Sequence, residues 1–280
     1  MKKITRRSFL AAAGLTAAAL ALTACGGSSS STASSVASSA AASSEAASSS
    51  AAAAELTTVE AGKLTMATNA AFPPYEMTTD AGEFEGIDIE TAQAIADKLG
   101  LELQIDDMDF DAALLSVQQG KADIVMAGVT VTDERKAVMD FSDSYATGIQ
   151  SIIVPEGSDI TSPDDLAGKK IGTQRGTTGY IYCSDDFGDD AVVAYDDGLT
   201  AVQALNNGQV DAVVIDNAPA KEFVAANPGL VILDTSYAEE DYAIGLAKGS
   251  ALEDAVNATL EELKADGTLQ SIVDKYITAE

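Results

Sequence analysis

The clearest candidate for ligand chemistry in this chain is an arginine that follows a short hydroxyl-containing loop. The segment from Ala122 to Ser142 predicts an apolar strand, a turn of small residues and a short helix at Arg135. A guanidinium group is planar and permanently charged, so it can hold a carboxylate at two points. Gly128 lets a ligand approach the backbone closely, and Thr130 offers a hydroxyl. Together these residues favour a site for the carboxylate of a small molecule, and the alternative is a surface ion pair of Arg135.

A second candidate group is the carboxylate of Asp216, which follows the apolar run from Ala212 to Ile215. This run predicts a strand, and α/β proteins bind ligands at the carboxyl ends of their strands. The carboxylate is suited to accept hydrogen bonds from an ammonium group. The alternative is an N-cap of the helix that begins at Asn217, and the residues alone leave both interpretations open.

Composition excludes several classes of function. The chain of 280 residues contains no histidine, which removes Ser-His-Asp and Cys-His catalysis and argues against a zinc site. Its 44 acidic and 16 basic residues give a formal net charge of −28, which repels nucleic acids and anionic lipid headgroups. The aspartates between Asp185 and Asp197 lack the spacing of a calcium loop. We therefore expect no metal, no cofactor and no nucleic-acid partner.

Residues 1–24 have the form of a secretory signal peptide. Basic residues from Lys2 to Arg7 precede an apolar run, and Cys25 follows a Leu-Thr-Ala sequence. This ending resembles a bacterial lipobox, which implies that Cys25 carries a lipid on the mature protein; the alternative is a plain cleaved signal. The Thr-Arg-Arg-Ser-Phe-Leu segment also resembles a twin-arginine signal, so the Sec and twin-arginine export routes both stay open.

Residues 25–55 continue from Cys25 as a stretch of mainly serine and alanine. Such a composition has too little large apolar surface to offset the entropy of ordering, so it predicts a flexible linker. The linker would join a lipid on the outer face of the cell membrane to a folded body that begins near Leu56. Cys183 then has no partner in the chain, and we interpret it as a small buried apolar residue.

The body alternates predicted strands and helices in two similar series. The first series consists of strands at 64–68, 101–105 and 124–127 and helices at 88–99 and 112–119, with Asp88 as a predicted N-cap. The second consists of strands at 149–154, 170–173, 192–195 and 212–215 and helices that begin at 177 and 198. A strand at 242–247 and helices at 252–263 and 269–276 follow. This order predicts two α/β lobes, each with a mixed, mostly parallel sheet flanked by helices.

Four motifs in this body resemble one known family. They are Asn-Ala-Ala-Phe-Pro-Pro-Tyr-Glu at 69–76, Gly-Ile-Asp-Ile-Glu at 86–90, Thr-Val-Thr-Asp-Glu-Arg at 130–135 with Phe141-Ser142, and Asp-Ala-Val-Val-Ile-Asp at 211–216. In this order they resemble the extracellular solute-binding proteins of polar amino-acid ABC importers, bacterial solute-binding protein family 3, over nearly all of residues 60–276. Tyr276-Ile277 departs from a Trp-Phe pair that is frequent in the family, at a structural position.

The resemblance implies a type II periplasmic-binding-protein fold, in which two lobes joined by two hinge crossovers close on a ligand. Lobe 1 would comprise 56–146 and 242–280, and lobe 2 would comprise 147–241. The protein would bind a polar L-amino acid outside the cell as a monomer and deliver it to the permease and ATPase of an ABC importer. It would have no enzymatic activity and would contact the membrane only through the lipid on Cys25.

The resemblance also implies roles for individual residues. Arg135, helped by Gly128 and Thr130, would bind the α-carboxylate, and Asp216 would bind the α-ammonium group. The other expected ligand contacts are Asn69, Phe72, Phe110, Gln174, Thr177 and Thr178. Core packing is the alternative for the two phenylalanines, and helix capping is the alternative for the two threonines.

The ligand side chain stays open between two classes. Asn69 stands where binders of cationic amino acids often carry aspartate, which favours a neutral ligand such as glutamine or cystine. The surroundings of Gln174 and Asp216 instead resemble arginine binders.

Two other functions remain as alternatives on the same fold. One is an enzyme of the cyclohexadienyl dehydratase type, for which Glu76 is a conceivable acid. The other is a sensor that reports ligand to a membrane receptor.

Overall fold

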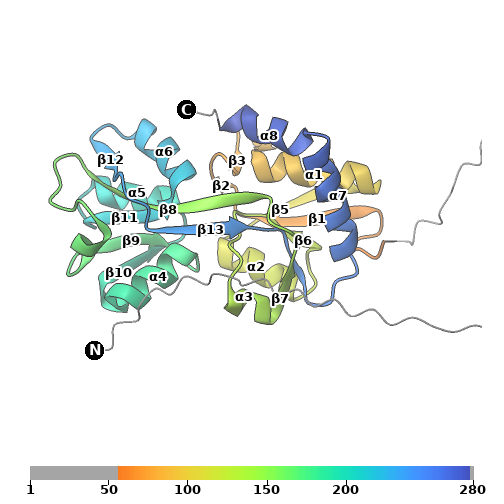
Figure 1. Ribbon diagram of the computed structural model, residues 1–280, viewed down its shortest axis with the longest axis horizontal. Helices are drawn as coiled ribbons and strands as arrows, with labels where there is room; N and C mark the ends of the chain where they lie inside the picture. The colour runs from red at the N-terminus through yellow and green to blue at the C-terminus, as the bar shows by residue number, and fades with distance from the viewer. Residues whose placement is uncertain (1–55, 278–280) are drawn as a thin grey trace, which may run out of the picture. The chain divides into compact units, whose positions relative to one another are not determined.

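The structure is a computed structural model, and it describes residues 56–277. The predicted signal peptide, Cys25, the predicted linker and residues 278–280 lie outside the described residues. The described part contains two larger β-sheets, each flanked by helices (Figure 1). We call the first of these sheets with its helices the first lobe, and the second sheet with its helices the second lobe.

The first lobe is built on a five-stranded sheet with the strand order β5-β1-β6-β14-β7. Its strands are β1 (Lys63–Thr68), β5 (Glu102–Asp107), β6 (Ile124–Val125), β7 (Met139–Phe141) and β14 (Gly245–Ala247). Its helices are α1 (Ile87–Leu99), α2 (Phe110–Gln118), α3 (Asp133–Val138), α7 (Glu253–Ala265) and α8 (Thr268–Tyr276). Because side chains alternate along a strand, Leu64 and Met66 of β1 pack into the core with α1 and α7, whereas Ala67 packs with α2. A small sheet of β2 (Ala71–Phe72), β3 (Glu76–Thr78) and β4 (Phe84–Glu85) belongs to the same lobe.

The second lobe is built on a six-stranded sheet with the order β10-β9-β11-β8-β12, in which β13 also pairs with β8. Its strands are β8 (Ala146–Pro155), β9 (Ile171–Gln174), β10 (Val192–Tyr195), β11 (Ala212–Asp216), β12 (Leu230–Ile232) and β13 (Ala238–Tyr242). Its helices are α4 (Thr178–Phe187), α5 (Gly198–Asn206) and α6 (Asn217–Ala226), with short 3-10 turns at Pro163–Leu166 and Asp189–Ala191.

Two antiparallel strands carry the chain between the lobes. β8 follows β7 of the first sheet, and β13 precedes β14 of the first sheet. Ala146 lies opposite Tyr242 at the end of this pair, so both crossings leave the second lobe at the same point. Figure 1 shows the two strands side by side between the sheets. A hinge made of two adjacent strands allows the lobes to rotate about one axis.

The predicted alternation of strands and helices is confirmed, and the structure adds five strands that were not predicted, β2, β3, β4, β7 and β12. Three of the predicted features need correction. The strand predicted at 242–247 is two strands, β13 and β14, because the chain passes from one sheet to the other there. Antiparallel pairing is more extensive than predicted, since β8, β13 and β14 all run against their neighbours. Asp88 does not cap α1: Gly86 occupies the N-cap, and the buried Asp88 Oδ2 accepts a hydrogen bond from Gly128 N at 3.0 Å.

The backbone at Gly86 predicts a large loss of stability for Gly86→Ala. The φ angle is 131°, and an added Cβ would lie 2.2 Å from the carbonyl oxygen of Tyr75, which is backbone and cannot turn aside. We expect the free energy of unfolding, measured by urea denaturation, to fall by more than about 3 kcal/mol. Gly82→Ala is the matched control, because Gly82 also has a positive φ, of 79°, but open space around its Cα. Equal losses in the two variants would contradict the steric explanation.

Candidate functional site

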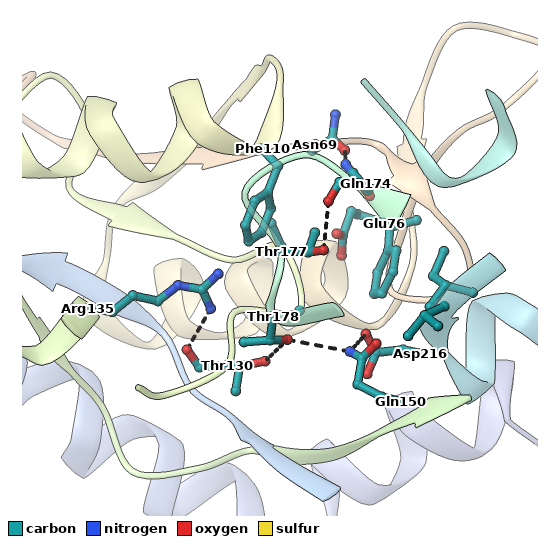
Figure 2. Close-up of a pocket in the computed structure, with 15 residues that line it drawn as sticks. Asn69, Glu76, Phe110, Thr130, Arg135, Gln150, Gln174, Thr177, Thr178 and Asp216 are labelled. Carbon is teal, nitrogen blue, oxygen red and sulfur yellow. Dashed lines mark hydrogen bonds between the residues drawn. The ribbon is translucent and has the colours of Figure 1, made fainter. Parts of the chain in front are cut away.

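A narrow cavity, with about 20 Å³ of space for the centre of a water molecule, lies between the two lobes. All ten ligand contacts named from the sequence line it, namely Asn69, Phe72, Phe110, Gly128, Thr130, Arg135, Gln174, Thr177, Thr178 and Asp216. Glu76, Ala127, Gln150, Val214 and Ile215 line it as well. Figure 2 shows the lining residues from both lobes around this cavity, with the main polar ones and Phe110 labelled.

Arg135 is positioned by the first turn of α3. Thr132 caps this helix, and its hydroxyl accepts a hydrogen bond from Arg135 N at 3.1 Å. The guanidinium is buried: Nη1 donates to Thr130 O at 2.8 Å, and Nη2 donates to the Gly176 carbonyl of the second lobe at 3.1 Å. It lies 5.3 Å from the ring centre of Phe110. No carboxylate of the described residues forms an ion pair with Arg135, so its alternative as a surface ion pair is wrong.

Burial lowers the pKa of Arg135 from its ordinary value, and the negative charge of Glu240 is the largest opposing influence. An arginine stays protonated under this shift, since its ordinary pKa is far above neutrality. The desolvated charge is therefore available to an anionic group that enters the cavity.

Gly128 has a left-handed backbone with a φ of 55°. A Cβ at this position would lie 2.8 Å from the ring of Phe72 and 3.3 Å from the ring of Tyr242. A side chain is therefore excluded for two independent reasons, and Phe72 packs directly on the glycine.

Asp216 ends β11 and stands at the N-cap position of α6, but its side chain makes no capping hydrogen bond. Its Oδ2 instead accepts from Gln150 Nε2 at 2.7 Å. The capping interpretation is therefore wrong, and the carboxylate faces the cavity (Figure 2). Burial raises the pKa of Asp216 to about 7.

The pKa of Asp216 predicts how stability depends on pH. The unfolded chain releases this proton above its ordinary pKa of 3.8, whereas the folded protein keeps it until about pH 7. This residue therefore makes the unliganded protein less stable as the pH rises through that window. We expect Asp216→Asn to have a higher Tm than the wild type at pH 8, with a gap that closes towards pH 4. A gap that stays constant across the scan would contradict this.

Asn69 and Gln174 meet across the two lobes. Gln174 Nε2 donates to Asn69 Oδ1 at 2.8 Å, and Asn69 Nδ2 donates to Met108 O at 3.0 Å. Both ends of the Asn69 amide are thus engaged by the protein. Thr177 is engaged too, because its hydroxyl caps α4 by accepting from Tyr180 N at 3.3 Å and donates to Gln174 O at 2.8 Å.

The two phenylalanines fit both interpretations made from the sequence. Phe72 and Phe110 line the cavity. Phe72 also belongs to a buried hydrophobic cluster with members from both lobes, and Phe110 belongs to one in the first lobe. They are aromatic walls and core residues at once.

Glu76 is the main site residue that the sequence analysis did not select as a ligand contact. It is fully buried, no cation pairs with its carboxyl group among the described residues, and its carboxyl group interacts with that of Asp88. Burial, with the negative charge of Asp88, raises the pKa of Glu76 well above its ordinary value. Its only sequence signal was its place in the 69–76 motif. Gln150 was also missed, although a glutamine inside the apolar run of β8 was a signal that it faces something polar.

The described residues bring together no group of three or more side chains suited to hold a metal ion. Among residues 56–277 we also find no helix with the length and hydrophobicity that a bilayer-spanning segment needs.

Comparison with known proteins agrees with this geometry. Residues 64–279 match the family of bacterial extracellular solute-binding proteins, family 3. An L-cystine-binding protein of Escherichia coli K12 is 33% identical over 226 residues, which are 79% of this chain and 85% of the relative. An arginine-binding extracellular protein of Bacillus subtilis 168 is 32% identical over 230 residues, which are 78% of this chain and 87% of the relative.

Solved structures give the same result. A mutant of the arginine-binding protein ArgBP from T. maritima superposes with a TM-score of 0.74 and 38% identity, covering 78% of this chain and 96% of that one. An ancestral arginine-binding protein bound to arginine gives a TM-score of 0.73 and 42% identity, covering 77% and 98%. The fold is thus the two-lobed periplasmic-binding-protein fold, and the chain belongs to family 3 of the bacterial extracellular solute-binding proteins.

Proposed function

We propose that this protein binds a cationic L-amino acid, with L-arginine as the preferred ligand, between its lobes. At the coarser level it is a polar amino-acid-binding protein of an ABC transporter, as its family and its relatives for cystine, arginine and glutamine indicate. These relatives are binding proteins, which agrees with the absence of enzymatic activity expected from the sequence and not with a dehydratase.

The observation that carries the choice of a cation is the buried carboxyl group of Glu76 in the cavity wall, which has no cationic partner among the described residues. A buried charge without a partner is costly, so this group needs either a proton or a cation beside it. Arg135 and Asp216 already match the carboxylate and ammonium groups of any amino acid. Glu76 then matches a second positive charge, which arginine has and glutamine lacks.

The aromatic walls support the same choice. Phe72 and Phe110 line the cavity together with Glu76, and a guanidinium group stacks favourably on aromatic rings. Asn69 does not argue for a neutral ligand in this structure, because Gln174 and Met108 already use both ends of its amide.

Lobe closure would couple the two charged ends of the ligand. Arg135 belongs to the first lobe and Asp216 to the second, so a zwitterion reaches both only when the lobes are together. The bonds from Arg135 to Gly176 and from Gln174 to Asn69 are made in this closed arrangement. Ligand would favour the closed form through these differential contacts. We place the lobe boundaries at 56–146 with 242–280, and at 147–241.

We also propose that the protein acts as a monomer held at the outer face of the membrane by a lipid on Cys25, and that it delivers ligand to a permease and its ATPase. The lipobox-like ending of the signal supports the anchor. Labelling with radioactive palmitate should mark the wild type and leave Cys25→Ser unlabelled; label in both would disprove this anchor.

A thermal-shift panel tests the ligand class. We expect arginine to raise the Tm most, lysine and histidine less, and glutamine and cystine least, because a ligand stabilises only the state that binds it. At a concentration of about 100 times Kd the stabilisation is about 2.7 kcal/mol. A largest shift with glutamine or cystine, and none with arginine, would disprove the proposed cation.

A further inference from the structure

We propose that Glu240 is a positioning residue that latches the two lobes together and holds part of the unliganded protein in the closed form. Glu240 lies on the hinge strand β13, opposite Gly148 of the hinge strand β8. It is outside the lining of the ligand cavity, so it acts through other residues rather than on the ligand. The inference uses the cleft of the proposed function but does not depend on which amino acid enters it.

One oxygen of Glu240 gathers donors from both lobes and from the hinge. Oε2 accepts from the Thr130 hydroxyl of the first lobe at 3.1 Å and from the Thr178 hydroxyl of the second lobe at 2.9 Å. It also accepts from Gln150 Nε2 of β8 at 3.0 Å. Hydrogen bonds to an ionised acceptor are stronger than neutral ones, and burial strengthens them further.

The hydrogen bonds of Glu240 are expected to break when the lobes separate. The side chain is 6% exposed, and the carboxylate also interacts with the hydroxyl of Tyr182. Its negative charge is the largest influence that opposes the lowering of the Arg135 pKa by burial. The hydroxyls of Thr130 and Thr178 lie 3.5 Å apart, so separating the lobes breaks at least one bond to Oε2. The closed form is therefore stabilised by the contact of both lobes with the Glu240 carboxylate, even without a ligand.

Gln150 links this latch to the ligand site. Its Nε2 donates both to Glu240 Oε2 at 3.0 Å and to Asp216 Oδ2 at 2.7 Å. An ammonium group of the ligand that binds Asp216 therefore contacts a carboxylate that is linked to Glu240 through Gln150. This arrangement ties the hinge to the ligand-binding carboxylate without a direct contact between Glu240 and the ligand.

The test measures the distance between the lobes without ligand. Spin labels are attached at Gln118→Cys on α2 and Asp185→Cys on α4, both exposed and on different lobes (Figure 1), with Cys25→Ser in the background. Cys183 is buried and is protected from the label. Electron double resonance then gives the populations of short and long distances.

We expect the wild type to show a short-distance population that Glu240→Ala reduces about tenfold, which is the effect of losing one such hydrogen bond. Glu240→Gln should restore part of it, since the amide oxygen still accepts but carries no charge. Glu239→Ala, on the exposed side of the same strand, should match the wild type.

Two results would overturn the proposal: a wild type without the short population, or a short population that Glu240→Ala and Glu240→Gln leave unchanged. A merely structural role would lower the Tm of these variants without moving the distances. Because no ligand is added, failure of arginine in the thermal panel would leave this result intact, and the two proposals fail separately.

Discussion

Replacing Arg135 with alanine is expected to weaken binding of the amino acid by at least about 100-fold while the fold stays intact. The variant removes the guanidinium, which is buried and lies in the cavity wall. Charge-assisted hydrogen bonds contribute roughly 1.5–3 kcal/mol each, so losing a two-point contact exceeds the threshold for a 100-fold change. Isothermal titration calorimetry with arginine measures the loss, and circular dichroism checks the fold.

Arg175→Ala is the matched control for this prediction. Its side chain is 57% exposed, and its guanidinium is 3.8 Å from Asp196, a weak surface contact. We expect binding within about twofold of the wild type in this control. Near-native affinity in Arg135→Ala itself would remove Arg135 from the site.

Replacing Glu76 with glutamine is expected to remove the preference of the cavity for arginine over glutamine. Kd for arginine should rise about 100-fold, because the amide no longer offsets the second positive charge in a dry site. Kd for glutamine should stay about the same, since the raised pKa already favours a neutral carboxyl group at Glu76 when no cation is bound, and the amide is neutral too. Competition calorimetry with both amino acids gives the ratio directly.

The same residue predicts a pH dependence of binding. The raised pKa favours the protonated form of Glu76 without ligand, whereas a bound cation favours its ionised form. Arginine binding therefore releases a proton, and its affinity rises with pH; in Glu76→Gln this contribution disappears. Glu83→Gln, an exposed glutamate between β3 and β4, is the control. A variant at Glu76 that still prefers arginine and still releases the proton would contradict the assignment.

Many helices and strands were predictable because the spacing of apolar residues within one element indicates its type. Strands such as Lys63–Thr68 and helices such as Gly198–Asn206 have apolar residues at the spacing of their own element, so the sequence pattern identified them closely. The motif at 130–135 located Arg135 within its short helix. The ten ligand contacts expected from the motifs all line one cavity.

The contacts that could not be predicted are made between residues far apart in the sequence. Asn69 and Gln174 are 105 positions apart, and only the closed lobes show that the Gln174 amide donates to the Asn69 amide oxygen. Glu76 lies in a strand of three residues, which is too short for an alternating pattern to tell its buried side. Glu240 sits in an acidic stretch that reads as solvated surface, although the strand turns this one carboxylate inward. Asp88 is a residue type that often caps helices, but its carboxylate instead accepts a hydrogen bond from the backbone of Gly128.

A crystal structure of this protein with L-arginine would test the account most directly. We expect the α-carboxylate against the Arg135 guanidinium, the α-ammonium against Asp216 and the ligand guanidinium beside Glu76, between Phe72 and Phe110. A ligand with its ends reversed, or one bound outside the space between the lobes, would contradict the central claim.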